Sequence, residues 1–156
     1  MIDFIKQLPM LEGFTNILVI MDCLTKQVVF IPTHNTINVP ALAELFVKHI
    51  FSKYGIPSYV IFDWSPEFVS IFFKSLAKSV SIKFYFTSGY YLEANGQIEK
   101  TNQALEQYLC IYYNYQQSNW VHLLSLAKFA FNNAPLAFTS IFLFFANKCY
   151  GITLEL

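Results

Sequence analysis

Charged side chains are scarce in this sequence. Asp, Glu, Lys and Arg make up only 13% of its 156 residues, whereas 55% are hydrophobic and 19% are aromatic. Soluble domains usually carry about twice that share of charge. So apolar a composition argues against a disordered chain, because it supplies ample surface to bury. The length suits one domain with a substantial core, so we expect a single domain over residues 1–156.

Long hydrophobic runs and a secretory leader are also missing. Runs such as 17–21 and 141–146 are far shorter than the roughly 20 residues of a spanning helix, and the longer stretch 136–154 is interrupted by polar residues. The first residues lack a basic segment followed by an apolar core and a small-residue cleavage site. We therefore expect no membrane association and an intracellular location, nuclear or cytoplasmic.

The sequence has few cysteines and no net charge. The three cysteines, Cys23, Cys110 and Cys149, are odd in number and widely spaced, which argues against both a disulfide framework and a zinc cluster. The formal net charge is zero. That balance does not favour a nucleic-acid partner, because neutralisation of phosphates by Lys and Arg usually supplies much of the affinity. Any such partner must be inferred from motifs.

The first third of the chain predicts strands. Residues 17–21 and 28–32 are short runs of β-branched and aromatic residues separated by the polar segment 22–27, a pattern typical of two antiparallel strands joined by a turn. Residues 3–5 are expected to form a strand before them. Gly and Pro number only five and six, so few turns are marked and no long linker is expected.

The next segment predicts a helix and a buried strand. Apolar residues recur every three to four positions from Val39 to Tyr54, which indicates an amphipathic helix ended by Gly55. Residues 58–62 are almost wholly apolar, as expected for a strand covered on both faces, and such strands are usually parallel. This strand stops at Asp63.

The remaining pattern alternates helix and strand. Pro66 is expected to open a second helix, residues 83–87 a strand, and residues 96–115 and 119–133 two further helices, the last ended by Pro135. Strands flanked by helices in this order predict a three-layer α/β domain with a mixed central sheet.

The helix expected over 96–115 separates apolar from polar residues. The buried stripe is predicted to hold Ile98, Leu105, Leu109 and Tyr112. The polar face is predicted to hold Glu99, Asn102, Gln103 and Glu106.

The positions of the carboxylates are informative. Asp63 ends a strand expected near the middle of the sheet, where ligands bind in open α/β folds. Glu99 is expected in the first turn of its helix, where its charge suits the helix dipole. Ordinary explanations exist for each: Asp63 can cap a helix, Glu99 can be a solvated acid, and Asp22 is best explained as the start of a turn. Spacing alone does not decide between a catalytic and an ordinary structural role for these acids.

Five ordered motifs carry a family resemblance. They are DFIKQLP at 3–9, ILVIMDCLTK at 17–26, GIPSYVIFDWSPEF at 55–68, TSGYYLEANGQIEKTN at 87–102 and WVHLLSLAKFAFNNAP at 120–135. Together they resemble the integrase of gypsy-type LTR retrotransposons, nearly from end to end. The 35 residues between Asp63 and Glu99 are the spacing expected between the last two acids of the retroviral integrase DDE triad.

The resemblance implies an RNase H-like fold with catalytic acids Asp3, Asp63 and Glu99, since Asp3 rather than Asp22 matches the first acid. These carboxylates are expected to bind two Mg²⁺ or Mn²⁺ ions, for which hard oxygen ligands are suited. Two ions about 3.5 to 4 Å apart hold the attacking and leaving oxygens of one displacement at phosphorus. The implied activity is 3′ end processing of element DNA and its transfer into target DNA.

The expected partners follow from the same resemblance. They are DNA, both element ends and target, and further copies of the chain, because integrases generally work as multimers. Lys100, Asn102 and Gln103 are candidate DNA contacts on the exposed helix face, although a solvated surface explains these residues equally well. The zinc-binding stretch and the basic tail that the family normally supplies are not seen in this sequence.

Departures from the family pattern support an alternative function without catalysis. Where the family reads Asp-Arg-Gly-Pro-Glu-Phe, residues 63–68 read DWSPEF, so a cation and a glycine beside the expected metal site are lost. Many replacements are of the kind produced by single transitions in a codon. The alternative is therefore a catalytically decayed integrase that acts only as a folded nucleic-acid-binding or interaction domain. An RNase H-like nuclease of another branch is a weaker third reading, because fold does not decide function.

Overall fold

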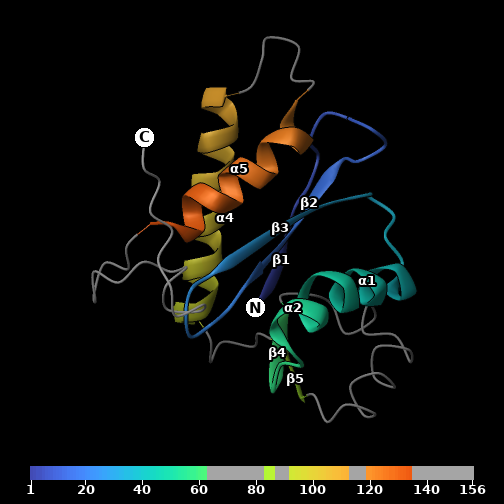
Figure 1. Cartoon of the computed structure of the whole chain (residues 1–156), viewed down its shortest axis with the longest axis vertical. Coiled ribbons are helices and arrows are strands. Elements are labelled where there is room, and N and C mark those ends of the chain that lie inside the picture. Colours follow the sequence, from blue (N-terminus) through green and yellow to red (C-terminus); the bar gives the residue numbers. More distant parts are fainter. Residues whose placement is uncertain (63–82, 87–91, 113–118, 135–156) are drawn as a thin grey trace.

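A five-stranded mixed sheet forms the centre of the computed structural model, which describes residues 1–62, 83–86, 92–112 and 119–134 (Figure 1). The strand order is β3-β2-β1-β4-β5, with β1 antiparallel to β2, β2 antiparallel to β3, and β4 parallel to both β1 and β5. The mixed sheet predicted from the sequence is confirmed. The strands are β1 Ile2–Ile5, β2 Asn16–Met21, β3 Val28–Thr33, β4 Tyr59–Phe62 and β5 Lys83–Phe86.

Helices flank this sheet, and their bounds lie close to those predicted. They are α1 Val39–Phe46, the π-helical segment η1 Val47–Phe51, α2 Ser52–Tyr54, α4 Leu92–Tyr112 and α5 Trp120–Asn132. The second helix, expected to open at Pro66, lies outside the described residues. Within the described part of the chain, no helix is long and apolar enough to cross a membrane.

The first helix is continuous over the predicted range but changes its hydrogen bonding midway. The Asn38 side chain caps its start by accepting a hydrogen bond from the Ala41 backbone N–H at 2.9 Å. In η1 the Ser52 N–H donates to the carbonyl of Val47, five residues back, which is the π-helical pattern. Gly55 ends the helix with φ of 82°, a left-handed conformation that favours glycine.

Strand β2 is buried on both faces. Its side chains alternate, so Leu18 and Ile20 pack against the α1 layer, where Phe46 is buried. Val19 and Met21 pack against the α4 and α5 layer with Trp120. All six residues of β2 are therefore buried, and the three-layer architecture predicted from the sequence is present.

The predicted buried stripe of α4 is correct at three of its four positions. Ile98, Leu105 and Leu109 are buried in the core with α5. The prediction for Tyr112 was wrong, because its side chain is 55% exposed. Tyr112 lies in the last turn of α4 and contacts Tyr108 instead, with ring centroids 4.6 Å apart.

Among the described residues, β3 is the strand at one edge of the sheet, and one side chain from α5 covers part of that edge. Asn132 is buried at 4% exposure. Its Oδ1 accepts a hydrogen bond from the Val28 N–H and its Nδ2 donates to the Val28 carbonyl, both at 2.8 Å. This two-bond contact joins residues 104 positions apart and ties α5 to the sheet.

Replacing Asn132 with alanine tests this contact. Asn132→Ala leaves both backbone groups of Val28 without their partner in a buried environment, so we expect the free energy of unfolding to fall by about 2 to 4 kcal/mol. Urea denaturation followed by circular dichroism measures the change. The matched control is Asn133→Ala at the next position. Equal denaturation midpoints for the two variants would show that the contact contributes nothing specific.

Candidate active site

Asp3 lies on β1 and faces the α4 layer. Its neighbours Ile2 and Phe4 pack in the α1 cluster, while Ile5 packs in the α4–α5 cluster, so the alternation of the strand turns Asp3 toward α4. The carboxylate is half-buried. Its Oδ1 accepts a hydrogen bond from the Phe4 N–H at 2.7 Å, and its Oδ2 accepts one from Asn102 Nδ2 at 2.6 Å.

The bond between Asn102 and Asp3 places α4 beside β1. Asn102 is three residues after Glu99, so the two side chains emerge on neighbouring turns of α4. Glu99 is exposed, whereas Asn102 is half-buried and its Oδ1 is buried without a hydrogen-bond partner in the described structure. The helix that carries one predicted catalytic acid is thus bonded to the strand that carries another.

The position expected for Glu99 within its helix was wrong. The helix begins at Leu92 rather than at Gly96, so Glu99 lies in the helix interior and not in its first turn. The helix dipole acts mainly on the terminal turns and therefore gives this carboxylate little support. The exposure of Glu99 remains consistent with a side chain that is accessible to a ligand.

Asp63 lies outside the described residues, but its chain neighbour is described. Phe62 ends β4 and pairs in parallel register with Ile2, which immediately precedes Asp3. In the described part of the chain, no group of three His, Cys, Asp or Glu side chains is arranged to hold a metal ion. Asp3 and Glu99 are the members of the predicted triad that the structure describes.

The predicted DNA contacts lie on the exposed part of α4 with one difference. Lys100 and Gln103 are exposed, as expected. Asn102 is turned toward the sheet, where it binds Asp3. Its contact with Asp3 was not predicted, because nothing in the sequence connects residues 99 positions apart.

The turn between β2 and β3 holds the first half of α4. Lys26 Nζ donates hydrogen bonds to the Gln97 Oε1 and to the Cys23 carbonyl, both at 2.6 Å. Gln97 is two residues before Glu99, so this contact fixes the helix close to the candidate site. Sequence reasoning missed it because both residues are ordinary surface types.

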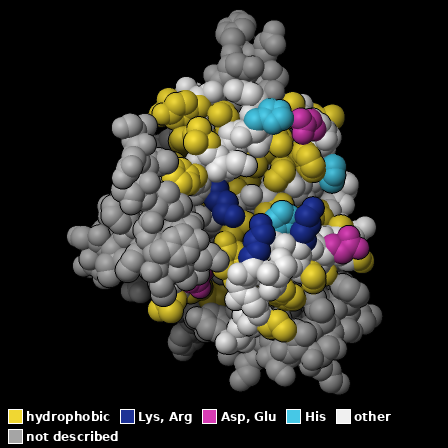
Figure 2. Space-filling view, in the orientation of Figure 1, with side chains coloured by type: hydrophobic (Ala, Val, Ile, Leu, Met, Phe, Trp, Pro, Cys, Tyr) yellow, Lys and Arg dark blue, Asp and Glu magenta, His cyan; other side chains and the backbone are white. Residues whose placement is uncertain are grey.

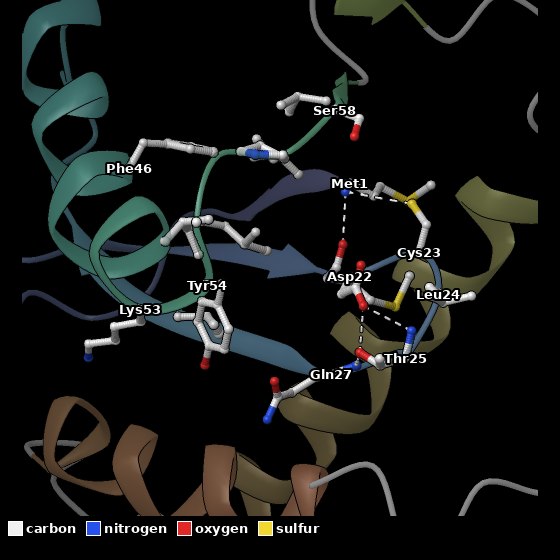
Figure 3. Close-up of a pocket in the computed structure, with 18 residues that line it drawn as sticks. Met1, Asp22, Cys23, Leu24, Thr25, Gln27, Phe46, Lys53, Tyr54 and Ser58 are labelled. Carbon is white, nitrogen blue, oxygen red and sulfur yellow. Dashed lines mark hydrogen bonds between the residues drawn. The ribbon is translucent and has the colours of Figure 1, made fainter. Parts of the chain in front are cut away.

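A cavity of about 850 Å³ lies on the other side of the sheet (Figure 3). Residues of α1 and α2 and the β2–β3 turn line it, among them Phe46, Tyr54 and Gln27. Asp3 and Glu99 do not line it. The cavity is therefore separate from Asp3 and Glu99, the two predicted catalytic carboxylates that the structure describes.

Comparison with known proteins supplies the family context. No family model matches the chain. It is 29% identical over 132 residues to the transposon Tf2-3 polyprotein of Schizosaccharomyces pombe, a match covering 85% of this chain and 10% of the polyprotein. The Tf2-4 polyprotein of the same organism matches equally. The chain thus spans about a tenth of the length of these relatives.

Solved structures show the fold. The chain matches a cryo-electron-microscopy structure of the simian T-cell lymphotropic virus intasome with a TM-score of 0.73 and 19% identity, covering 94% of this chain and 52% of that one. It matches the HTLV-2 integrase catalytic core domain, in complex with magnesium in a trimeric form, with a TM-score of 0.68 and 15% identity, covering 94% and 91%. The BIV integrase catalytic core gives 0.72 and 16%, covering 94% and 90%.

The chain has the integrase catalytic core fold. The RNase H-like architecture and the resemblance to retrotransposon and retroviral integrases, both predicted from the sequence, are confirmed.

Within this integrase-like fold, Asp22 stabilises a turn. Its Oδ2 accepts hydrogen bonds from the Thr25 N–H at 2.9 Å and from the Thr25 hydroxyl at 2.5 Å (Figure 3). Burial is the largest influence and raises the pKa of Asp22, but the hydrogen bonds from Thr25 and the Leu24 N–H together bring the pKa below its usual value. The structure thus supports the prediction that Asp22 starts the turn.

The lowered pKa of Asp22 makes its contribution depend on pH. A carboxyl group with a lower pKa in the folded state stabilises the fold above its unfolded-state pKa, near 3.8, and loses that contribution as the pH falls through the folded value. We expect Asp22→Ala to lower the free energy of unfolding at pH 7 by at most about 1 kcal/mol, and the difference from wild type to shrink below pH 3.8.

A double-mutant cycle with Thr25→Val provides the control. If Asp22 acts through Thr25, the double variant loses little more than either single variant in urea titrations. Fully additive losses at pH 7 would contradict this account.

Proposed function

We propose that this integrase core carries out DNA integration as a metal-dependent polynucleotidyl transferase, performing 3′ end processing and strand transfer of retrotransposon DNA. The observation that carries the proposal is the 2.6 Å hydrogen bond from Asn102 to Asp3, which brings the helix of Glu99 beside the strand of Asp3. The pairing of Phe62 with Ile2 adds support, because these residues directly precede Asp63 and Asp3.

Asp3, Asp63 and Glu99 are the proposed ligands of two Mg²⁺ or Mn²⁺ ions. Carboxylate oxygens are hard donors of the kind these cations prefer. Asp3 is only half-buried and Glu99 is exposed, so their oxygens are reachable from solvent. The HTLV-2 core domain, which shares this fold, is known in complex with magnesium. When bound, such ions activate the attacking oxygen and stabilise the leaving oxygen of a phosphodiester displacement.

Asn102 is the proposed positioning residue for Asp3. By donating to Oδ2, it fixes the rotamer of the carboxylate and leaves the remaining lone pairs of its two oxygens for a cation. Lys100 and Gln103 are exposed on the same helix beside Glu99 and are proposed to contact the DNA backbone, which Lys neutralises.

The proposed reaction needs no covalent enzyme intermediate. Water first attacks a phosphodiester near the 3′ end of the element and breaks its bond to the 3′ oxygen, which leaves a free 3′ hydroxyl on the element. That hydroxyl then attacks a phosphodiester of the target DNA, forms a new phosphodiester bond and releases a 3′ hydroxyl of the target strand. The role of the protein is to hold the reacting groups in line. We also propose that residues 1–156 form one catalytic domain of a larger polyprotein, and that it works inside the cell, in the nucleus or cytoplasm, as a homo-oligomer.

Two solved structures of the same fold support the proposal of a homo-oligomer. One forms part of a viral intasome, and another is a trimeric core domain.

A second candidate function is that of a non-catalytic remnant. Trp64 and Ser65 follow Asp63 where the family pattern has arginine and glycine, so a bulky side chain replaces a cation next to the proposed metal ligands. Such a chain keeps the fold and a DNA or partner surface without turnover. Calorimetric titration with Mn²⁺ separates the two candidates, because a folded remnant of this kind shows no binding heat.

Removing one carboxylate charge tests catalysis directly. We expect Asp63→Asn and Glu99→Gln each to lower strand transfer by at least about 100-fold, because each loses a metal ligand. The assay uses the whole chain, Mn²⁺ and a terminal-repeat oligonucleotide. Asp22→Asn is the matched control and retains activity, since Asp22 serves the turn. Equal product from wild type and Asp63→Asn would reject the proposed activity.

The positioning role of Asn102 predicts a loss of metal affinity. We expect Asn102→Ala to weaken Mn²⁺ binding by about 10- to 100-fold, the usual effect of removing a residue that orients a metal ligand. The loss shows as a higher Mn²⁺ requirement, and saturating Mn²⁺ restores much of the activity. Glu106→Gln, on the exposed part of the same helix, is the control. An unchanged Mn²⁺ requirement in a folded Asn102→Ala protein would rule this role out.

A further inference from the structure

Four basic side chains from two helices meet on one face of the molecule. Lys48, His49 and Lys53 belong to the η1–α2 part of the first helix, and Lys128 belongs to α5. All three lysines act electrostatically on His49. Figure 2 shows Lys side chains gathered around a histidine between α5 and the first helix. We refer to the three lysines, Lys48, Lys53 and Lys128, as the cationic cluster.

The cationic cluster is unusual for a chain of zero net charge. All ten cationic residues of the sequence are lysines, and three of them lie here. In the described part of the chain, neither Lys48 nor Lys53 forms an ion pair with a carboxylate, even though Glu44 is one helical turn before Lys48. Figure 3 shows the amino group of Lys53 directed away from Asp22. Glu44 and Asp22 therefore do not neutralise the charges of Lys48 and Lys53.

Packing holds these like charges together. Both helices that carry the cluster pack on β3: α5 contacts the face of Phe30, and the first helix packs on the face of Val29 and Ile31. Burial, and then Lys53, Lys48 and Lys128, lower the pKa of His49. The lysines thus create a positive potential that extends about 8 to 10 Å into solvent at physiological salt.

We propose that the cationic cluster binds phosphate groups of a DNA backbone at a surface separate from the catalytic carboxylates. Lysine is a point charge that suits phosphate, and without arginine the cluster lacks the fork that reads guanine edges, so the contact is independent of sequence. Lysine is depleted from protein–protein interfaces, which disfavours an acidic protein as the partner. The inference uses the DNA substrate of the proposed function but none of its metal chemistry.

The cluster lies apart from the candidate active site and would supply an additional DNA contact. It lies beside the edge strand β3, whereas Asp3 is on β1, with β2 between them. Lys100, on α4, belongs to the Asp3 side. A DNA duplex bound at the cluster would therefore not depend on contacts with the catalytic carboxylates. Binding at this surface is expected to persist when metal is removed.

The test measures DNA binding without metal. Fluorescence anisotropy of a labelled random-sequence duplex in EDTA gives affinity against salt for the whole chain. We expect Lys48→Gln and Lys53→Gln each to weaken binding severalfold at low salt and to reduce the slope of log affinity against log salt by about 0.9, the value for one lost phosphate contact. The matched control is Lys6→Gln, also an exposed lysine, which leaves the slope unchanged.

Charge-retaining variants separate a binding role from a structural one. Lys48→Arg and Lys53→Arg are expected to keep the wild-type slope, and circular dichroism checks that every variant is folded. The proposal is overturned if Lys6→Gln weakens binding as much as Lys53→Gln, if the arginine variants lose the slope as well, or if wild type does not bind the duplex. It is also overturned if the glutamine variants lose binding to a polyglutamate peptide but not to DNA.

The result of this DNA-binding test does not depend on the proposed catalytic activity. Asp63→Asn is expected to bind the duplex in EDTA like wild type, whatever its strand-transfer activity. Failure of the cluster proposal therefore appears as an unchanged salt slope, and failure of the proposed function appears as unchanged product.

Discussion

The burial of β2 on both faces is the constraint on which the rest of the structure depends. All six of its residues are buried, so helices must cover the sheet from both sides. That requirement accounts for a composition that is 55% hydrophobic and only 13% charged. It also limits where a carboxylate can stand. Asp3, on the strand next to β2, needs a polar partner from the covering layer, and Asn102 supplies it.

Sequence periodicity predicted the elements better than their ends. Residues 17–21, 28–32 and 39–54 formed the expected strands and helix because each pattern repeats over several positions. The π-helical hydrogen bonds of η1 leave no sequence signal. The start of α4 was expected near Gly96, yet the helix begins four residues upstream at Leu92, so Gly96 lies inside it although glycine usually weakens a helix interior by about 1 kcal/mol.

The candidate site was less predictable than the fold. Glu99 could be singled out by its spacing from Asp63, but Asp3 was identified only through family resemblance. The bonds that organise the site, Asn102 to Asp3 and Lys26 to Gln97, join residues 99 and 71 positions apart. Such contacts arise only when the layers pack, so a single sequence does not reveal them. Histidine and lysines that gather from separate helices, as around His49, are hidden for the same reason.

The contact of Asn132 with Val28 has a consequence for how copies of the chain can associate. Backbone groups on the outer side of an edge strand alternate, so those of Val28, Phe30 and Pro32 point away from β2. Val28 already bonds to Asn132 and Pro32 has no N–H to donate, so two of these three residues cannot form both backbone hydrogen bonds with a neighbouring strand. Growth of the sheet by adding a strand beside β3 is therefore blocked at both ends of that edge. In a chain this rich in apolar and aromatic residues, both features work against aggregation by strand pairing at β3.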